Sequence, residues 1–494
     1  MPKKNYKIQF VDRILDPVHG FIDITQVEKE IIDLPIFKRL QTLKQLSLTN
    51  WVFPGAEHTR YMHSLGVMYI VDLMASNLKD TQNKLKFNDE QRQLLRLAGL
   101  LHDIGHYPLS HVTEGVYQDN LLKEVDSLEE YNQKIFNKIK NKFINKTPQV
   151  PGYMKSRYSQ PMHHEFMGAE VIKSDVDIQR IIHKYCPFIN IDDITDIIVG
   201  DVDNNPNISA MVQLMHSELD ADGMDYIMRD ATFSGTTYGG FELGLLLRNL
   251  VVTEYKGVDI VGIRPKGISL VDQYLISKYF SYTQVIMNRH VSIYNTMAEL
   301  FTKTLINLDK SNYPHPQTLL KYVQNHCNNE DFLKFTDRAF WSQLDSIVKS
   351  DLEKIQPDFI VQVHNKLQHY QEFEVAEDGE FIVTTNKPGS VYNQLINTKL
   401  YTHLKNNEAN RLFVYLEKSF TNELPEEVFK KYINPVDSNM SSAQYDKFNV
   451  PRLQEGIVVI DPSANDLKLL VDDPRSIMSH LYDTKTYILR EYKI

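Results

Sequence analysis

The chain has 494 residues, of which 42% are hydrophobic and 24% are charged, and its formal net charge is −10. This length predicts two or three domains, or one large domain with additions. The negative charge makes nucleic acid an unlikely general partner, because sequence-independent binding uses a basic surface, but it does not exclude a local phosphate pocket. The two cysteines, Cys186 and Cys327, form no CxxC pattern, so we expect neither a disulfide framework nor a cysteine zinc site.

The N-terminal residues lack an apolar core of signal-peptide length, and the chain has no run of about eighteen apolar residues. We therefore expect a cytoplasmic protein that does not cross a membrane.

Apolar residues recur at spacings of three and four over most of the first 310 residues, which predicts a mainly α fold. The clearest helical stretches are RLQTLKQL (39–46), HSLGVMYIVDLMASNL (63–78), DEQRQLLRLAGLLHDIGH (89–106) and HHEFMGAEVI (163–172). One exception is LVVTEYKGVDIVGIRP (250–265), in which β-branched residues flank YKG and predict a hairpin.

After about residue 370 the pattern changes to short β-rich runs separated by polar or proline-containing loops. These runs are EFIVTTN (380–386), RLFVYLEK (411–418), GIVVID (456–461) and TKTYILREY (484–492). We expect a helical body over residues 1–310 with an insertion at about 115–160, a helical connection over 311–370, and a smaller α+β region over 371–494.

A basic segment interrupts the helical body. Its cationic residues are Lys134, Lys138, Lys140, Lys142, Lys146, Lys155 and Arg157. This pattern is typical of a solvated helix face followed by a loop, and the alternative is a basic lid over an anionic substrate.

The stretch LLHDIGHYPLSH (100–111) places three histidines and an aspartate next to apolar residues of a helix. Burying a polar group without a partner costs roughly 2–7 kcal/mol, and a metal ion is one way to compensate. His102 and Asp103 point about 100° apart around a helix, so both can reach one ion beside it. His106 follows one turn later, and His111 lies beyond a glycine and a proline that interrupt the helix.

Two further segments offer matching groups. HTRYMHSLGV (58–67) contains Arg60 and His63, and ELDADGMDYIMRD (218–230) contains Asp220, Asp222, Asp225, Tyr226 and Asp230. Each histidine alone could be an ordinary hydrogen-bonded residue. Together the segments provide two imidazoles and two carboxylates without sulfur, a ligand set that suits a first-row divalent cation and hydrolytic chemistry.

The motifs DPVHGFI, KRLQTLKQL, VFPGAEHTRYMHSLGV, LLHDIGHYPLSH, HHE and ELDADGMDYIMRD follow one another over roughly residues 13–310. In this order they resemble the HD-domain deoxynucleoside triphosphate triphosphohydrolases, which include bacterial dNTPases and the vertebrate SAM-and-HD-domain enzyme. The resemblance does not extend to a SAM domain, and it is loose in the C-terminal region. It implies an HD-domain helical body.

The resemblance implies that four residues hold a divalent metal ion, whose identity (Mn, Fe, Mg, Zn, Co or Ni) stays open: His63, His102, Asp103 and Asp222. It implies that His164, paired with Glu165, is the catalytic histidine, and His163 is the alternative. His106 and His111 would line the phosphate path. Further substrate contacts would come from Gln45 at the sugar edge, Arg60 on phosphate, and Asp220, Tyr226 and Asp230.

The implied reaction is attack of metal-activated water on the α-phosphorus of a dNTP, which releases a deoxynucleoside and inorganic triphosphate. Relatives assemble as dimers of dimers, so we expect a homo-oligomer, either a dimer or a tetramer. Asp33 matches a residue that reads a guanine edge in nucleotide-activated relatives, although Gln41 replaces the accompanying arginine. The alternative for Asp33 is a turn carboxylate before Pro35.

Several positions depart from the family pattern. Gly223 stands where the vertebrate enzyme has a phosphate-contacting lysine, and Met287 and Asn288 replace a Tyr-Gln pair near the sugar 3′-hydroxyl. Lys278 and Tyr279 fall near an arginine that grips the terminal phosphate. These departures motivate a second hypothesis, an HD phosphohydrolase acting on another nucleotide or on single-stranded nucleic acid. A third is a nucleotide sensor without enzymatic activity.

Overall fold

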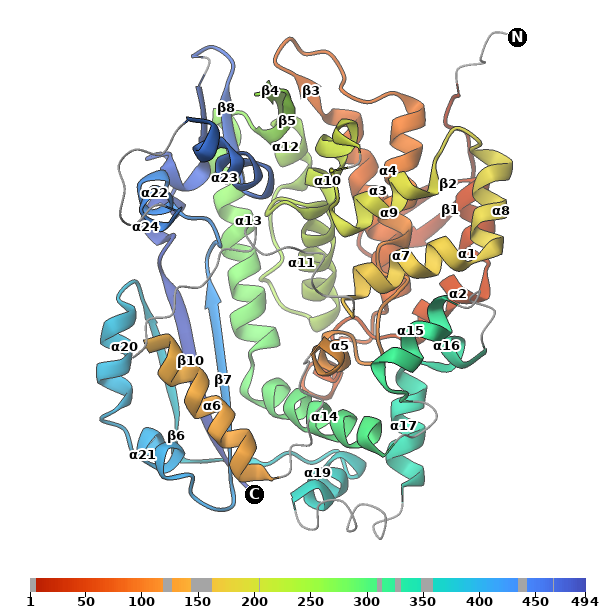
Figure 1. The fold of residues 1–494 in the computed structure, drawn as a ribbon. Helices are drawn as coiled ribbons and strands as arrows, with labels where there is room; N and C mark the ends of the chain where they lie inside the picture. Colours follow the sequence, from red (N-terminus) through yellow and green to blue (C-terminus); the bar gives the residue numbers. More distant parts are fainter. Residues whose placement is uncertain are drawn as a thin grey trace.

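The computed structural model describes residues 6–118, 127–143, 162–203, 205–308, 313–324, 330–347, 359–433, 442–464 and 466–494 (Figure 1). Helices dominate this part of the chain, and its strands form three small sheets, ordered β1-β2, β6-β10-β7 and β3-β4-β5-β8-β9. The expected fold class, a mainly α body with a smaller α+β C-terminal region, is confirmed.

The first elements are β1 (Phe10–Asp16), β2 (Gly20–Thr25), α1 (Gln26–Ile32), α2 (Pro35–Lys38), η1 (Arg39–Thr42), η2 (Thr49–Trp51), α3 (Arg60–Asn77), β3 (Lys79–Asp80), α4 (Asp89–Leu101) and α5 (His111–Gln118). The middle of the chain forms α6 (Leu128–Phe143), α7 (His164–Ser174), α8 (Val176–Tyr185), α9 (Ile191–Val199), η5 (Pro206–Ile208), α10 (Ser209–His216), α11 (Ala221–Ser234), α12 (Leu243–Arg248), β4 (Leu250–Tyr255), β5 (Val258–Ile263), η6 (Pro265–Gly267), α13 (Ile268–Phe280), the π-helical η7 (Ser281–Ile286) and α14 (Arg289–Asn307).

The last part forms α15 (Pro316–Gln324), α16 (Glu330–Lys334), α17 (Asp337–Ser346), α19 (Phe359–Gln368), β6 (Glu374–Thr385), α20 (Pro388–Leu395), α21 (Lys399–Asn406), β7 (Arg411–Ser419), α22 (Glu426–Ile433), α23 (Ser442–Glu455), β8 (Val458–Asp461), β9 (Asp466–Leu469), η8 (Leu470–Asp472), α24 (Met478–Leu481) and β10 (Lys485–Lys493). All four β-rich runs expected after residue 370 are strands: β6, β7, β8 and β10.

Helices α3 and α4 pack against each other in the helical body, and α11 packs against α3. Asn88 begins α4 with a capping box, because its side chain accepts from the Gln91 amide while the Gln91 side chain accepts from the Asn88 amide. The apolar face that the sequence predicts for α4 is fully buried. The helix itself ends at Leu101, so His106 lies in the following turn rather than one helical turn after His102.

The hairpin expected at 250–265 is confirmed by the antiparallel pair β4–β5. Lys256 and Gly257 form its turn with φ of 53° and 83°, the left-handed region that such a tight turn uses. A second hairpin, β1–β2, was missed within the stretch expected to be helical. Its turn depends on Gly20 at φ 73°.

The helix predicted for residues 39–46 is wrong beyond Thr42. Leu43 is extended, and Lys44 forms a β-bridge with Thr59 and donates its amide to the buried Asp337 carboxylate. These long-range backbone contacts replace the helical hydrogen bonds that the local pattern favours.

The expected division at residues 310 and 370 stays a prediction, but two contacts join the parts. Strand β8 pairs in parallel with β5 of the helical body. Helix α6 packs through Ile139 and Phe143 on the β6-β10-β7 sheet, which Figure 1 shows beneath it.

Helix α6 also carries the described half of the basic segment. Lys142 pairs with Glu417, and the Lys138 ammonium lies 5.5 Å from the ring centre of Tyr415. The described residues therefore fit a partly solvated helix face on this sheet. Lys146, Lys155 and Arg157, and with them the lid hypothesis, lie outside the described residues.

Candidate active site

Three elements bring the four expected metal ligands together. His63 lies in the first turn of α3, His102 and Asp103 follow the end of α4, and Asp222 lies in the first turn of α11. His63 Nε2 is 2.9 Å from Asp222 Oδ1 and 3.9 Å from Asp103 Oδ2, and His102 Nε2 is 3.4 Å from Asp103 Oδ1. The His63 and Asp103 side chains are buried, whereas that of Asp222 is 40% exposed, so the cluster opens on the Asp222 side.

Both imidazoles of this cluster are oriented from behind. His63 Nδ1 donates to Asp225 Oδ2 at 2.7 Å, and His102 Nδ1 donates to the Gly99 carbonyl at 2.8 Å. The opposite nitrogens face the carboxylates: His63 Nε2 lies 2.9 Å from Asp222 Oδ1, and His102 Nε2 is buried without a hydrogen-bond partner. A ring held through one nitrogen, with the other facing carboxylates, is the usual arrangement of metal-binding histidines.

The charge of the cluster also fits a cation. Burial lowers the pKa of His63, but the carboxylates of Asp222 and Asp225 outweigh burial and raise this pKa to about 10. A divalent cation would neutralise the same excess of negative charge. Two imidazole nitrogens and two carboxylates therefore form a donor set that fits a divalent metal ion.

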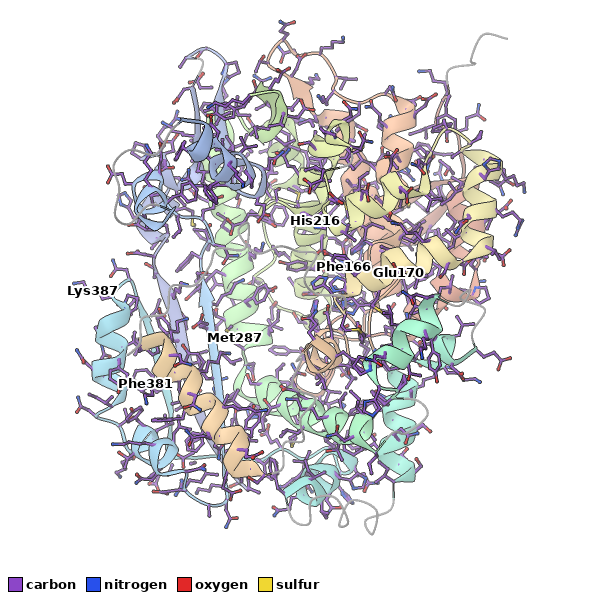
Figure 2. All side chains as sticks on the ribbon, in the orientation of Figure 1. Phe166, Glu170, His216, Met287, Phe381 and Lys387 are labelled. Atoms are coloured by element: carbon purple, nitrogen blue, oxygen red, sulfur yellow. The ribbon has the colours of Figure 1, made fainter. Side chains whose placement is uncertain are left out.

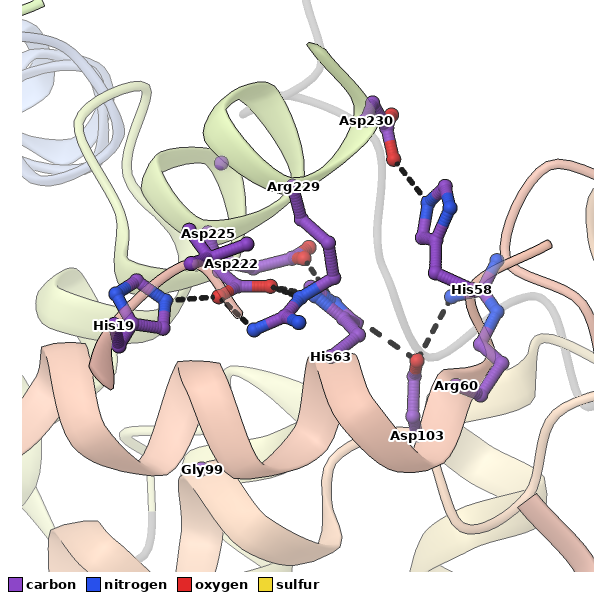
Figure 3. A network of polar contacts seen from close by, with 12 residues as sticks. His19, His58, Arg60, His63, Gly99, Asp103, Asp222, Asp225, Arg229 and Asp230 are labelled. Carbon is purple, nitrogen blue, oxygen red and sulfur yellow. Dashed lines mark hydrogen bonds and ion pairs between the residues drawn. The ribbon is translucent and has the colours of Figure 1, made fainter. Parts of the chain in front are cut away.

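Asp225 is the centre of a buried network behind His63 (Figure 3). His19 Nε2 lies 2.5 Å from Asp225 Oδ1, and the Arg229 Nε donates to Asp225 Oδ2 at 2.8 Å. Burial raises the pKa of Asp225, but Arg229, His19 and His63 hold it well below its usual range. The approach of Asp225 to α3 requires glycine at position 66, where a Cβ atom would lie 1.9 Å from Asp225 Oδ1. The sequence alone did not indicate that Asp225 orients His63.

Arg60 braces the other side of the cluster. Its Nη1 donates to Asp103 Oδ2 at 2.8 Å, its Nε donates to Ser110 Oγ at 3.0 Å, and the residue is buried. Burial raises the pKa of Asp103, but Arg60 first, and then His102, hold it far below its usual range. Asp103 is therefore ionised and ready to bind a cation.

A second group of side chains adjoins the metal-ligand cluster. His164 Nδ1 lies 2.9 Å from Glu114 Oε1, and His111 Nδ1 lies 2.7 Å from Glu114 Oε2. The rings of His106 and His164 are stacked with their centres 4.3 Å apart. His164 Nε2 is 4.0 Å from Asp103 Oδ1, so the end of His164 opposite Glu114 faces the expected metal ligands.

Of the two stacked imidazoles, one is cationic and the other is neutral. Burial lowers the pKa of His164, but Glu114 above all raises it, to about 9, so His164 is cationic at neutral pH. Burial lowers the pKa of His106, and Arg60 and His164 lower it further, so His106 is neutral. His106 Nδ1 accepts from the Tyr107 amide at 3.0 Å, which places its proton on Nε2, a buried atom without a partner.

Glu114 is the acidic partner of His164 that the sequence analysis missed. Glu165, expected in that place, has one carboxylate oxygen 3.3 Å from His163 Nδ1 and the other 3.5 Å from His216 Nδ1. Only the spacing of three from His111, on a short helix, pointed to Glu114 in the sequence. The two chain segments meet closely because residue 105 is glycine, where a Cβ atom would lie 2.4 Å from the His164 carbonyl oxygen.

The turn that carries His106 and His111 is held from outside. Leu109 and Ser110 both adopt φ of 51°, which is strained for residues with a side chain. The Asp337 carboxylate accepts from the Leu109 amide at 2.8 Å and from the Lys44 amide at 2.9 Å. Sequence spacing gave no indication of Asp337, which lies 228 residues from Leu109.

The residues expected to contact the substrate differ in how fully their polar atoms are already hydrogen-bonded. Gln45 is buried, and its Oε1 has no hydrogen-bond partner. Asp220 caps α11 by accepting from the Gly223 amide at 2.7 Å. Tyr226 lies one helical turn after Asp222. Asp230 is buried and bonded to His58 Nε2 at 2.8 Å, which occupies one of its oxygens.

Asp33, the expected nucleotide-activation residue, is the C-terminal cap of α1. Its exposed carboxylate pairs with Lys38 Nζ at 2.9 Å. This geometry fits the turn-carboxylate alternative, and its role in nucleotide activation stays a prediction.

A family model, described as HD domain, matches residues 60–165. This chain contains an HD domain. The matched segment begins at Arg60 and includes His63, the His102-Asp103 pair and His164, while Asp222 lies outside it.

Two relatives match this chain over different lengths. The deoxynucleoside triphosphate triphosphohydrolase SAMHD1 of Gallus gallus is 46% identical over 100 residues, which cover 20% of this chain and 16% of SAMHD1. The uncharacterised protein YwfO of Bacillus subtilis is 29% identical over 271 residues, covering 55% of this chain and 50% of YwfO. The chain thus spans about half the length of YwfO.

Two solved structures share the fold along nearly the whole chain. A hypothetical protein from Aquifex aeolicus is 22% identical with a TM-score of 0.58, covering 97% of this chain and 96% of its own. A phosphohydrolase from Bacteroides thetaiotaomicron is 20% identical with a TM-score of 0.58, covering 98% of this chain and 100% of its own. Among the described helices, none is both long and apolar enough to cross a bilayer.

Proposed function

We propose that the protein is a metal-dependent phosphohydrolase that converts a dNTP into a deoxynucleoside and inorganic triphosphate. The observation that carries the proposal is the cluster itself: the Nε2 atoms of two imidazoles converge with two carboxylates, and a cationic histidine lies 4.0 Å from one of the carboxylates. The likeness to SAMHD1 over the HD segment supports the dNTP as substrate.

His63, His102, Asp103 and Asp222 would hold the divalent cation. When bound there, the cation would supply Lewis-acid activation of the attacking water and offset negative charge on the phosphate. Arg60 keeps Asp103 ionised and oriented for this purpose.

Two histidines of the chain can then donate protons to the phosphate and to the leaving group. Neutral His106 can donate its Nε2 proton to a phosphate oxygen, because that atom is buried without another partner. Cationic His164, held at Nδ1 by Glu114, can give its Nε2 proton to the departing 5′-oxygen. His163 is the weaker candidate for this proton, since its nearer carboxylate is Glu165 at 3.3 Å and its Nε2 lies 3.9 Å from Glu114, against 2.9 Å for His164 Nδ1.

The proposal is tested by analysing the products formed from dNTPs and NTPs with added Mn²⁺ or Mg²⁺. We expect inorganic triphosphate and deoxynucleoside in equal amounts from dNTPs. Release of pyrophosphate, of single phosphates or of a nucleoside monophosphate would contradict breakage of the bond between the 5′-oxygen and the α-phosphorus.

The second candidate is an HD phosphohydrolase for another nucleotide, and the sugar-edge departures favour it. Met287 is buried at the end of η7, between α13 and β7 in the view of Figure 2, and its carbonyl accepts from Arg490 Nη1 at 2.7 Å. A methionine side chain cannot hydrogen-bond a 3′-hydroxyl as a tyrosine can. Nucleoside monophosphates and single-stranded oligonucleotides in the same panel, if hydrolysed faster than dNTPs, would establish this alternative.

Nucleotide activation and assembly into a homo-oligomer are proposals supported by the resemblance alone. Light scattering with and without added nucleotide tests assembly, and the activity measured with and without a second nucleotide tests activation. A monomer under all conditions, with activity that does not respond to a second nucleotide, would exclude them.

The dyad of Glu114 and His164 predicts a pH profile. If protonated His164 is the acid, kcat/KM falls as pH rises through about 9, where His164 loses its proton. Glu114→Gln removes the main cause of the raised pKa, so the fall is expected to begin near or below the ordinary value of about 6.5. At pH 8 the variant is then expected to lose about tenfold or more in kcat/KM.

Glu165→Gln is the matched variant for this measurement. It contributes less to the pKa of His164 than Glu114 does, so its alkaline limb is expected to move less. If Glu165→Gln moves the limb and Glu114→Gln does not, Glu165 is the functional partner and the role of Glu114 is refuted.

A further inference from the structure

Two partly buried lysines lie near each other and near Asp220 and Tyr282. Lys278 lies in the last turn of α13, and Lys418 lies near the end of β7. In the part of the chain that the structure describes, neither ammonium has a carboxylate within 4.0 Å; the Lys418 Nζ lies 3.7 Å from the ring centre of Tyr282. The buried Arg60 of the same site, by contrast, is paired with Asp103.

The C-terminal sheet holds Lys418 firmly in this position. The rings of Tyr279 on α13 and Phe420 are stacked with centres 3.8 Å apart and planes at 11°. Just beyond β7, Thr421 Oγ1 donates to Glu218 Oε2 at 2.6 Å, and the Asn422 amide donates to Glu218 Oε1 at 3.1 Å. Figure 1 shows β7 running beside α13, and these contacts fix the end of the strand against the helices of the HD body.

Aromatic rings connect the lysines to the metal-ligand cluster. Tyr226 follows Asp222 by one turn of α11, and its ring meets that of Tyr282 edge-on at 6.4 Å. The ammonium of Lys418 rests on the same Tyr282 ring. Two ring contacts therefore link the Lys418 ammonium to the turn of α11 that follows Asp222, whose carboxylate is exposed.

The structure also shows why position 223, where the vertebrate enzyme has a phosphate-contacting lysine, cannot carry a lysine in this chain. A Cβ atom on Gly223 would lie 2.3 Å from Tyr274 Oη and 2.7 Å from Asp220 Oδ1, so no lysine fits there. Lys278 on α13 and Lys418 on β7 are the candidates to supply that charge.

The two ammonium groups destabilise each other without a counter-anion. Burial first, and then the neighbouring Lys278, lower the pKa of Lys418 to about 7, while Glu218 raises it. Burial lowers the pKa of Lys278 as well, but Tyr274, Asp220 and Glu218 raise it overall. An anion bound between the two lysines would remove this repulsion and keep both protonated.

We propose that Lys418 and Lys278 form an anion subsite that binds the outer phosphates of the nucleotide, so that the C-terminal sheet contributes a specificity-determining residue to the HD site. The choice of ligand rests on the proposed function. From the resemblance, Lys278 stands near the position of an arginine that grips the terminal phosphate, a departure from the family pattern, whereas nothing in the sequence singled out Lys418. The subsite would favour nucleoside triphosphates over nucleosides and monophosphates, because only their phosphate tail extends beyond the metal-bound phosphate.

The test measures binding without turnover. Isothermal titration of the full chain, loaded with Mn²⁺, uses inorganic triphosphate as one probe and deoxyguanosine as the other. Lys418→Met removes the ammonium and keeps the length of the side chain. We expect its Kd for triphosphate to rise by about 10- to 100-fold, as for loss of a hydrogen bond to a charged group. Its Kd for deoxyguanosine is expected to stay within about twofold of that of the unmodified protein.

Two controls separate this result from misfolding. Lys418→Arg keeps the charge and is expected to retain triphosphate binding within about fivefold. Lys405→Met removes an exposed lysine from α21 and is expected to change neither constant. Triphosphate binding by Lys418→Met at the affinity of the unmodified protein would overturn the proposal. A protein that fails to hydrolyse dNTPs would refute the proposed function instead, and the binding comparison would still decide the role of Lys418.

Discussion

Asp103→Asn is expected to abolish stoichiometric Mn²⁺ binding and to lower kcat/KM for dNTPs on the order of 10³-fold or more. The carboxylate lies 3.4 Å from His102 Nε2 and 3.9 Å from His63 Nε2, so it is adjacent to the Nε2 atoms of both histidines. An amide has one fewer acceptor oxygen and no charge to hold the cation. Loss of several kcal/mol of transition-state stabilisation from the metal corresponds to this change in rate.

The measurement combines metal content after gel filtration with a triphosphate-release assay. Asp72→Asn is a matched control, because Asp72 is also a buried carboxylate on an arginine, with Arg96 Nη1 2.9 Å away, but it lies outside the site. We expect Asp72→Asn to lower the melting temperature while metal content and kcat/KM stay near those of the unmodified protein. Full metal content and activity in Asp103→Asn would remove the proposed metal centre.

His164→Gln is expected to lower kcat by about 10²- to 10⁴-fold, the range typical of a lost general acid, while metal binding is retained. The imidazole is the cationic group nearest the cluster on the leaving side, and Glu114 both orients it and holds its proton. Glutamine can still meet Glu114 but has no proton to give. KM is expected to change little, because the group acts on the departing oxygen rather than on the bound triphosphate.

A substrate whose leaving group needs no proton separates catalysis from structure. With a p-nitrophenyl ester of triphosphate, the loss caused by His164→Gln is expected to shrink to about tenfold or less, since p-nitrophenolate leaves unprotonated. His111→Gln serves as the comparison, because its exposed ring shares Glu114 but lies on the outer side of the group. Equal losses on both substrates would show that His164 supports the fold of the site rather than proton transfer.

Local sequence patterns were sufficient for much of this fold. The 3.6-residue periodicity placed α3, α4 and α7, the YKG turn identified β4–β5, and short β-rich runs identified β6, β7, β8 and β10. Failures occurred where distant contacts override local preference. Residues 43–46 give their backbone hydrogen bonds to partners such as Asp337 and do not continue the helix, and β1–β2 is a short hairpin whose apolar residues show no clear period.

What the sequence by itself determined is the inventory and order of the proposed metal ligands, because His63, the His102-Asp103 pair and Asp222 stand at fixed places relative to helix ends that local patterns predict. Only the tertiary structure decided which groups orient and charge them. The contacts of Glu114 with His164, of His19 with Asp225 and of Lys418 with Tyr282 join segments 50, 206 and 136 residues apart. No spacing rule reaches across such separations, since these distances depend on how helices and strands pack rather than on how each one forms.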